Sequence, residues 1–154
     1  MAGKLASEPD SDIPVRLAKE ALDTANALSD LLYEIDVAIH AYAKTLEDIQ
    51  PQHSGKVFIR WSDGKPRAYR WERVGKTKWR AVHLPRANLA RRASSRGEFA
   101  DSYERVNDIL SDVSFLMNRR TAVLNVLGNF QRGASSLRRA QTERITALVE
   151  KALS

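Results

Sequence analysis

The sequence predicts an α+β protein that is mainly helical, with long antiparallel helices in a coiled-coil-like bundle and a three-stranded antiparallel β-meander inserted at one end. Two observations predict this fold. Apolar residues recur with a period of seven in both flanking parts of the 154-residue chain and with a period of two in residues 56–84. The hydrophobic content of 43% is enough for one domain with a sizeable core. We therefore expect a single domain over residues 14–154, preceded by a disordered leader at 1–13.

The first long helix is predicted over residues 15–49. Its apolar residues alternate in threes and fours from Ala18 to Ile49, which is a heptad seam of five repeats. Pro14 precedes the seam and Pro51 follows it, as expected for the ends of a helix. At about 1.5 Å per residue, this helix is about 50 Å long.

The meander at residues 56–84 is predicted to contain strands at 56–62, 67–74 and 78–84. β-Branched and aromatic residues alternate with charged ones in all three segments. Such alternation is typical of a strand that is buried on one side only. The three segments follow one another closely, so we expect an antiparallel sheet in sequence order.

Short turn signals separate these strands. Asp63-Gly64 is among the strongest hairpin signals, and Gly75-Lys76 suits a turn that needs positive φ at its first central position. Residues 85–97 open with a proline, which ends the last strand. We expect them to form a linker or a short helix that starts at this proline.

The last part of the chain is predicted to form helices at 98–128 and 134–153. Gly128 and Gly133 lie between the two apolar stripes, and each costs about 1 kcal/mol within a helix. A break there would let the last helix fold back as the third member of an antiparallel bundle. The alternative is one helix from 98 to 153 that extends past its partner. Either arrangement leaves apolar seams that predict a homodimer.

Positive charge is concentrated in the middle of the chain. Residues 56–96 contain 13 basic and 2 acidic residues, whereas residues 1–55 contain 4 basic and 10 acidic, and residues 97–154 contain 8 and 7. The middle segment therefore has a net charge of +11, whereas the whole chain has a net charge of +6, because the acidic first segment offsets part of it. Mutual repulsion destabilises such a segment unless an opposite charge compensates it. The distribution predicts an acidic ligand, either nucleic acid or an acidic protein surface.

The predicted strands combine basic and aromatic residues. Guanidinium groups bind phosphate oxygens through paired hydrogen bonds, and aromatic faces stack on unpaired bases. A small sheet can also enter the major groove of duplex DNA, where arginine bonds the edge of guanine, and in general shape the meander resembles the three-stranded DNA-binding sheets of some recombinases and transcription factors. The sequence leaves duplex and single-stranded targets open, and we expect DNA as the ligand in preference to RNA. The residues expected to contact nucleic acid are Arg60, Arg67, Tyr69, Arg70, Trp71, Arg73, Lys76, Lys78, Trp79 and Arg80.

Some of the same aromatic residues also suit a core. A three-stranded sheet must cover one face, and Val57, Ile59, Trp61 and Ala81 are natural candidates for that buried side. Trp61 and Trp71 fit either the core or the surface. A one-residue difference in a turn would move a strand's side chains to the opposite face, so the sequence leaves their position open.

A second group of arginines follows the first apolar stripe of residues 98–128. We expect most of them to pair with acidic residues near the start of the first helix, because antiparallel helices would bring these parts together. Arg120 differs, since it falls on the apolar seam, where it either extends its charge toward water or pairs with another chain. The other members are Arg119, Arg132, Arg138, Arg139 and Arg144.

The sequence does not indicate an enzyme. The chain has no cysteine, which excludes thiolate metal sites and cysteine nucleophiles, and His40, His53 and His83 are isolated from one another. The Gly-Lys-Thr segment at 75–77 lacks the phosphate-loop spacing, because Arg70 stands where a glycine is needed. We expect no catalysis, no metal and no cofactor.

These observations predict a nucleic-acid-binding protein that presents a basic, aromatic meander on a helical, dimeric scaffold. The alternative is a coiled-coil interaction, scaffold or regulatory protein whose basic sheet docks on an acidic protein partner. No run of about 18 apolar residues occurs, and the N-terminal residues lack the apolar core of a signal peptide. We therefore expect a cytoplasmic protein that does not bind membranes.

Overall fold

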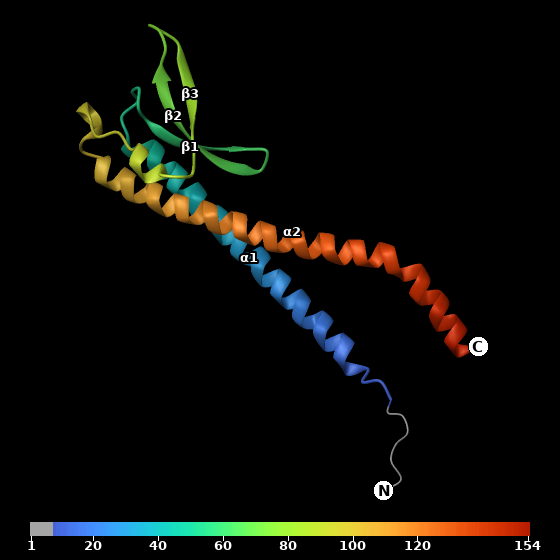
Figure 1. Cartoon of the computed structure of the whole chain (residues 1–154). Coiled ribbons are helices and arrows are strands. Elements are labelled where there is room, and N and C mark those ends of the chain that lie inside the picture. The colour runs from blue at the N-terminus through green and yellow to red at the C-terminus, as the bar shows by residue number, and fades with distance from the viewer. Residues whose placement is uncertain (1–7) are drawn as a thin grey trace.

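The computed structural model describes residues 8–154 and contains two long helices and one sheet (Figure 1). The strands are antiparallel and lie in the order β1-β2-β3. The mainly helical α+β fold predicted from the sequence is confirmed. In chain order the elements are α1 (Asp12–Ile49), β1 (Val57–Ser62), β2 (Lys65–Arg73), β3 (Trp79–Leu84), the short 3-10 helices η1 (Leu89–Arg92) and η2 (Gly97–Phe99), and α2 (Tyr103–Leu153).

Helix α1 begins at Asp12, three residues earlier than predicted. Pro14 therefore lies in the first turn, where a backbone N–H has no intrahelical acceptor and its absence costs no hydrogen bond. The expected disordered leader at 1–13 is thus shortened, since its last two residues are helical. Residues 1–7 of that leader lie outside the described residues.

Helix α2 is continuous over 51 residues, so the separate helices predicted at 98–128 and 134–153 are wrong. Gly128 and Gly133 both lie inside it. Each glycine lowers helix stability by about 1 kcal/mol relative to alanine, but neither forbids the helical backbone. No proline lies within the helix to interrupt it. The observed α2 corresponds to the alternative of one long helix, and no third helix folds back within the described chain.

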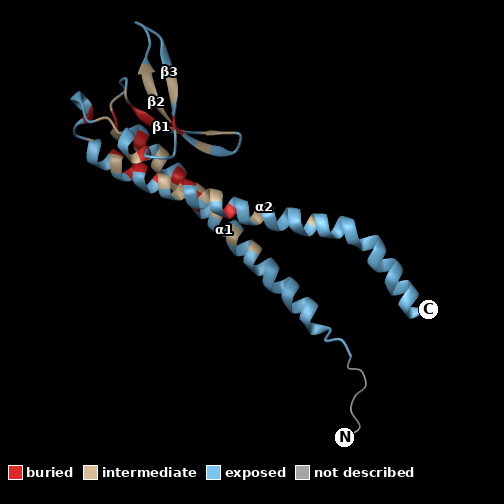
Figure 2. Ribbon diagram, viewed as in Figure 1, coloured by how far each residue is buried: buried red, intermediate tan, exposed pale blue. Residues whose placement is uncertain are grey.

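The two helices run antiparallel, pack together beside the sheet, and diverge toward their other ends (Figure 1). Buried residues are confined to the half near the sheet, as Figure 2 shows in red. A hydrogen bond of 2.9 Å from the Tyr42 hydroxyl to the Asp112 carboxylate also joins α1 to α2 there. The core residues are Ile35, Ile39, Leu46, Val57, Ala68, Leu84, Leu89, Val106, Ile109, Leu110, Val113, Met117 and Val123.

The sheet follows the predicted meander closely. Ser62 pairs with Lys65 across Asp63-Gly64, whose φ angles of 53° and 72° suit the two-residue hairpin turn that Asp-Gly predicts. Because this turn holds only two residues, β2 begins at Lys65 and not at 67. Pro66 is tolerated in β2 because its missing N–H would face the side on which β3 has already ended.

Candidate nucleic-acid interface

Alternation along the strands gives the sheet two different faces. The inner face packs on the helices and includes Trp61, whereas Trp71 lies on the outer face, which settles the position of both residues. Ala81 pairs with Trp71 and shares its face, so the expectation that Ala81 belongs to the core is wrong. The outer face consists of Phe58, Arg60, Ser62, Lys65, Arg67, Tyr69, Trp71, Arg73, Trp79, Ala81 and His83.

An aromatic stack occupies the centre of the outer face. The Phe58 ring lies 5.5 Å from the Tyr69 ring and 4.8 Å from the Trp71 ring, both nearly parallel to it. The Arg60 guanidinium covers the three rings at 5.3–6.0 Å from their centroids. Phe58 is therefore only 4% exposed, although it does not belong to the core between sheet and helices. The stack fixes a guanidinium over flat aromatic surfaces.

A hollow of about 390 Å³ lies at the edge of this face, between Trp71 and Trp79 on one side and Gln52 and His53 on the other. Trp79 is 46% exposed, which is high for a tryptophan. Lys56 lines the hollow as well, and its buried ammonium group donates to the Glu47 carboxylate at 2.5 Å. The hollow has aromatic walls and hydrogen-bonding groups at its rim, which suits a flat polar ring.

The acidic residue of the strands, Glu72, lies on the inner face. Arg70 and Arg80 donate to its carboxylate at 3.0 and 3.1 Å, and these hydrogen bonds, first that of Arg70, hold the pKa of Glu72 below its usual range. Both arginines are therefore turned away from the outer face and neutralised in part. Among the described strand residues, no aspartate or glutamate belongs to the outer face.

The structure brings together six of the ten residues predicted to contact nucleic acid. Lys76 and Lys78 lie within the β2–β3 turn at residues 74–78, which projects away from the helices (Figure 1). Arg73 extends along the same turn and donates to the carbonyl oxygens of Gly75 and Lys76 at 2.9 and 2.6 Å. Arg70 and Arg80 are on the opposite face. The six that share the outer face are Arg60, Arg67, Tyr69, Trp71, Arg73 and Trp79.

Sequence reasoning missed several members of the outer face, namely Phe58, Lys65 and His83. The His83 and Tyr69 rings pack edge to face with their centroids 5.7 Å apart, and Lys65 follows the first turn. The two-residue length of that turn fixes which residues of β1 and β2 face each other. If the Asp-Gly signal is taken to mean a two-residue turn, Ser62 pairs with Lys65. Alternation along the two strands then places Phe58 and Lys65 on the same face as Arg60.

No protein-family model, curated protein or solved structure matches this chain. No helix within residues 8–154 is both long and apolar enough to cross a membrane. The described side chains also include no group of three histidines and carboxylates placed to hold a metal ion.

Proposed function

We propose that this protein binds nucleic acid through the outer face of its sheet. One observation carries the proposal: basic and aromatic side chains share one face, while Glu72 with its two arginines lies on the other. Arg60 and Arg67 have no acidic partner among the described residues. Their charge is left for an external anion, and phosphate is the anion that arginine binds with two hydrogen bonds.

The aromatic groups favour a strand with unpaired bases. A base can stack on an exposed aromatic ring only when its own face is free, so stacking excludes an intact duplex. Trp71 and Trp79 border a hollow of about 390 Å³ that is large enough to take one base. We therefore propose single-stranded DNA as the preferred ligand, with RNA of the same sequence as the comparison.

The test is a fluorescence-anisotropy titration of labelled single-stranded DNA, duplex DNA and RNA at about 50 and about 200 mM salt. The variant replaces Arg60, Arg67 and Arg73 with glutamine. Each lost phosphate contact should reduce the slope of log affinity against log salt by about 0.7 for a single strand. A second variant, Trp71→Ala, should weaken single-strand binding by about 1–3 kcal/mol.

The matched control replaces three exposed arginines outside the sheet, Arg91, Arg92 and Arg96, with glutamine and so removes the same charge. This control should bind nearly as the parent does. Equal losses in the two triple variants would mean that only net charge matters. A parent protein that binds none of the three nucleic acids at about 50 mM salt would overturn the proposal and favour an acidic protein partner.

We also propose that the diverging ends of the helices pair with those of a second copy. The arginines of α2 other than Arg120 were expected to pair with acidic residues near the start of α1, but none of them forms an ion pair in the described chain, because the helices separate there. Residues 8–34 contain seven acidic and two basic residues, and residues 129–153 contain five basic and two acidic. The large apolar residues exposed there are Ile13, Val15, Leu17, Leu22, Leu31, Tyr33, Phe130, Leu137, Ile145, Leu148, Val149 and Leu153.

A two-fold dimer would place the acidic residues 8–34 of one copy against the basic residues 129–153 of the other. The exposed apolar residues of both segments would then be covered. Sedimentation velocity should therefore give twice the chain mass of 17.3 kDa. Replacing Leu137 and Leu148 together with glutamine should shift the protein to the monomer mass. The control is Phe115→Gln, which alters an exposed residue of α2 near the sheet. A parent that sediments as a monomer from micromolar to millimolar concentration would contradict the dimer.

A further inference from the structure

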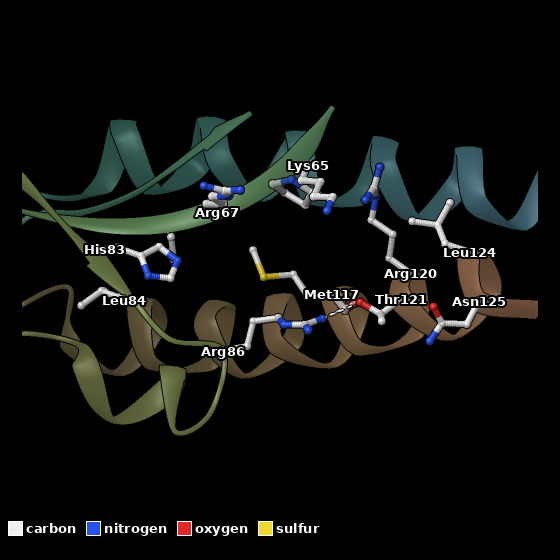
Figure 3. A pocket seen from close by; sticks show the side chains of 12 residues that line it. Lys65, Arg67, His83, Leu84, Arg86, Met117, Arg120, Thr121, Leu124 and Asn125 are labelled. Atoms are coloured by element: carbon white, nitrogen blue, oxygen red, sulfur yellow. Dashed lines mark hydrogen bonds between the residues drawn. The ribbon is translucent and has the colours of Figure 1, made fainter. Parts of the chain in front are cut away.

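A second cavity, of about 450 Å³, lies between β2 and α2 (Figure 3). Its origin is the unequal length of the strands. The pairing of β2 with β3 ends at Ala68 and Leu84, so residues 65–67 continue past β3 with a partner on only one side. The chain then leaves the sheet through Pro85, and the space beside this free edge of β2 stays open with α2 as its floor.

Four basic side chains line this cavity and no acidic side chain does. Lys65 and Arg67 enter from β2, Arg86 from the segment after β3, and Arg120 from α2 (Figure 3). Arg120 is neutralised by the Asp36 carboxylate at 2.7 Å. Within the described chain, the other three form no ion pair, so the cavity holds about three uncompensated positive charges.

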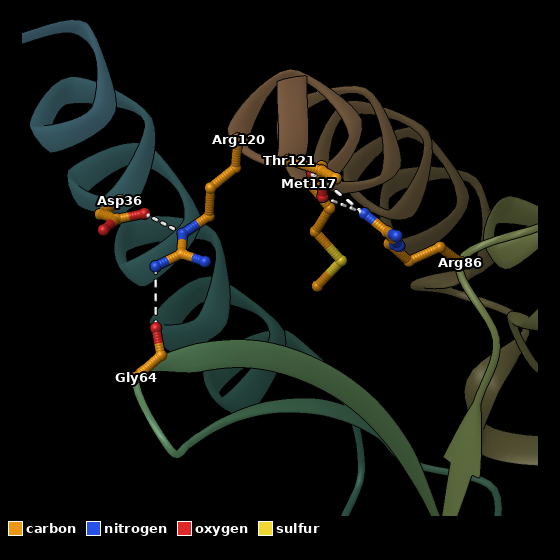
Figure 4. Close-up of polar contacts among 6 residues, drawn as sticks. All are labelled: Asp36, Gly64, Arg86, Met117, Arg120 and Thr121. Carbon is orange, nitrogen blue, oxygen red and sulfur yellow. Dashed lines mark hydrogen bonds and ion pairs between the residues drawn. The ribbon is translucent and has the colours of Figure 1, made fainter. Parts of the chain in front are cut away.

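Arg86 is held in position by neutral groups of α2 (Figure 4). One guanidinium nitrogen donates to the Thr121 hydroxyl at 2.5 Å and to the Met117 carbonyl at 3.3 Å, and the Ser114 hydroxyl donates to the Arg86 carbonyl at 3.3 Å. These contacts orient the guanidinium without cancelling its charge. A fixed cation with free N–H groups loses little side-chain entropy when an anion binds.

The rest of the lining combines apolar side chains with the neutral or weakly basic groups of His83, Thr121 and Asn125, and the cavity is large enough for more than a single ion. Met117 and Leu124 lie on the α2 side, and Ala68 and Leu84 on the sheet side. The volume falls within the range of about 300–1,000 Å³ that is typical of small-molecule sites. A nucleotide has the matching chemistry, since its phosphate needs cations and its base and sugar need a weakly polar wall.

We propose that this cavity binds a phosphate monoester of nucleotide size, with Lys65, Arg67 and Arg86 on the phosphate oxygens. A phosphate monoester carries a charge of about −1.5 to −2 at neutral pH and three strong acceptor oxygens, which suits three cations. The phosphate belongs either to a free nucleotide or to the 5′ end of a strand. This site does not depend on nucleic-acid binding by the outer face, although Lys65, Arg67 and His83 belong to both.

The experiment is isothermal titration of the full chain with adenosine 5′-monophosphate, with adenosine, and with one oligonucleotide in 5′-phosphorylated and unphosphorylated forms. Adenosine monophosphate should bind and adenosine should not. Arg86→Gln should weaken adenosine monophosphate binding by about tenfold or more, because it removes a charge-assisted hydrogen bond. Arg119→Gln is the control, since it removes the same charge from an exposed position that does not line the cavity.

The two phosphate sources are separated by the oligonucleotides. If the site accepts a strand end, the phosphorylated oligonucleotide should bind more tightly than the unphosphorylated one to the parent and equally to Arg86→Gln. If only free nucleotides fit, the two oligonucleotides should bind the parent equally while adenosine monophosphate still binds.

Failure of this cavity proposal can be distinguished from failure of the proposed single-strand binding by the outer face. Binding of the unphosphorylated strand measures the outer face and does not involve Arg86. Lys65→Gln, which removes a side chain that makes no hydrogen bond within the described chain, provides a second test if Arg86→Gln unfolds. Absence of adenosine monophosphate binding at millimolar concentration, or equal weakening by Arg86→Gln and Arg119→Gln, would overturn the proposal.

Discussion

Replacing Arg120 with methionine is expected to lower the free energy of unfolding by about 2.5–3.5 kcal/mol, because this side chain joins three parts of the fold. It donates to the Asp36 carboxylate of α1 at 2.7 Å and to the Gly64 carbonyl of the β1–β2 turn at 2.8 Å (Figure 4). Its guanidinium also lies 5.5 Å from the centre of the Trp61 ring. The sequence suggested a snorkelling side chain or a pairing between chains, whereas the structure shows an ion pair within the chain.

The magnitude follows from the exposure of the partners. The Arg120 side chain is 11% exposed and that of Asp36 is 31%, so Asp36 regains part of its hydration when the arginine is removed. The lost ion pair then costs about 1.5 kcal/mol, at the lower end for a charged hydrogen bond. The Gly64 contact and the cation–π contact add about 0.5–1 kcal/mol each. Methionine keeps the apolar stem packed in the seam, which limits the total.

Urea denaturation followed by tryptophan fluorescence, at one fixed protein concentration, measures this change. In a separate thermal melt, the melting temperature should fall by about 5–14 °C for a chain of this length. Arg119→Met is the control, because Arg119 is exposed and lies over the exposed Phe115 ring; its effect should stay within about 0.5 kcal/mol. In a double-mutant cycle, Asp36→Asn and Arg120→Met should be coupled by about 1 kcal/mol or more. Equal stabilities of the two methionine variants would refute the reasoning.

Two further predictions concern the sheet. Gly64→Ala should destabilise the fold by about 1 kcal/mol, because φ is 72° there although a Cβ would meet no neighbour; an unchanged urea midpoint would contradict this. Glu72 has a lowered pKa, so its pairing with Arg70 and Arg80 stabilises the fold above the usual carboxyl range and is lost as the pH falls through the folded pKa. Glu72→Gln should flatten the acid limb of the stability profile below about pH 4.5, and an identical acid limb would show that the pairing does not matter.

The sequence by itself determined the elements and their order. The seven-residue period, the two-residue period and the Asp63-Gly64 turn are local properties, because each depends on residues a few positions apart. They were sufficient to predict α1, the three strands and the placement of the sheet between two helical parts. The prediction of two separate helices divided at Gly128 and Gly133 was wrong, because glycine weakens a helix without ending it.

Only the tertiary structure decided how these elements present their side chains. The register of β2 against both neighbours sends Trp71 outward and Arg70 inward, and one strand residue of difference would exchange them. The cavity beside Lys65 exists because β3 stops at Leu84, and the divergence of the helices leaves their charged ends unpaired. These features depend on where distant segments end and cross, which no short-range pattern specifies.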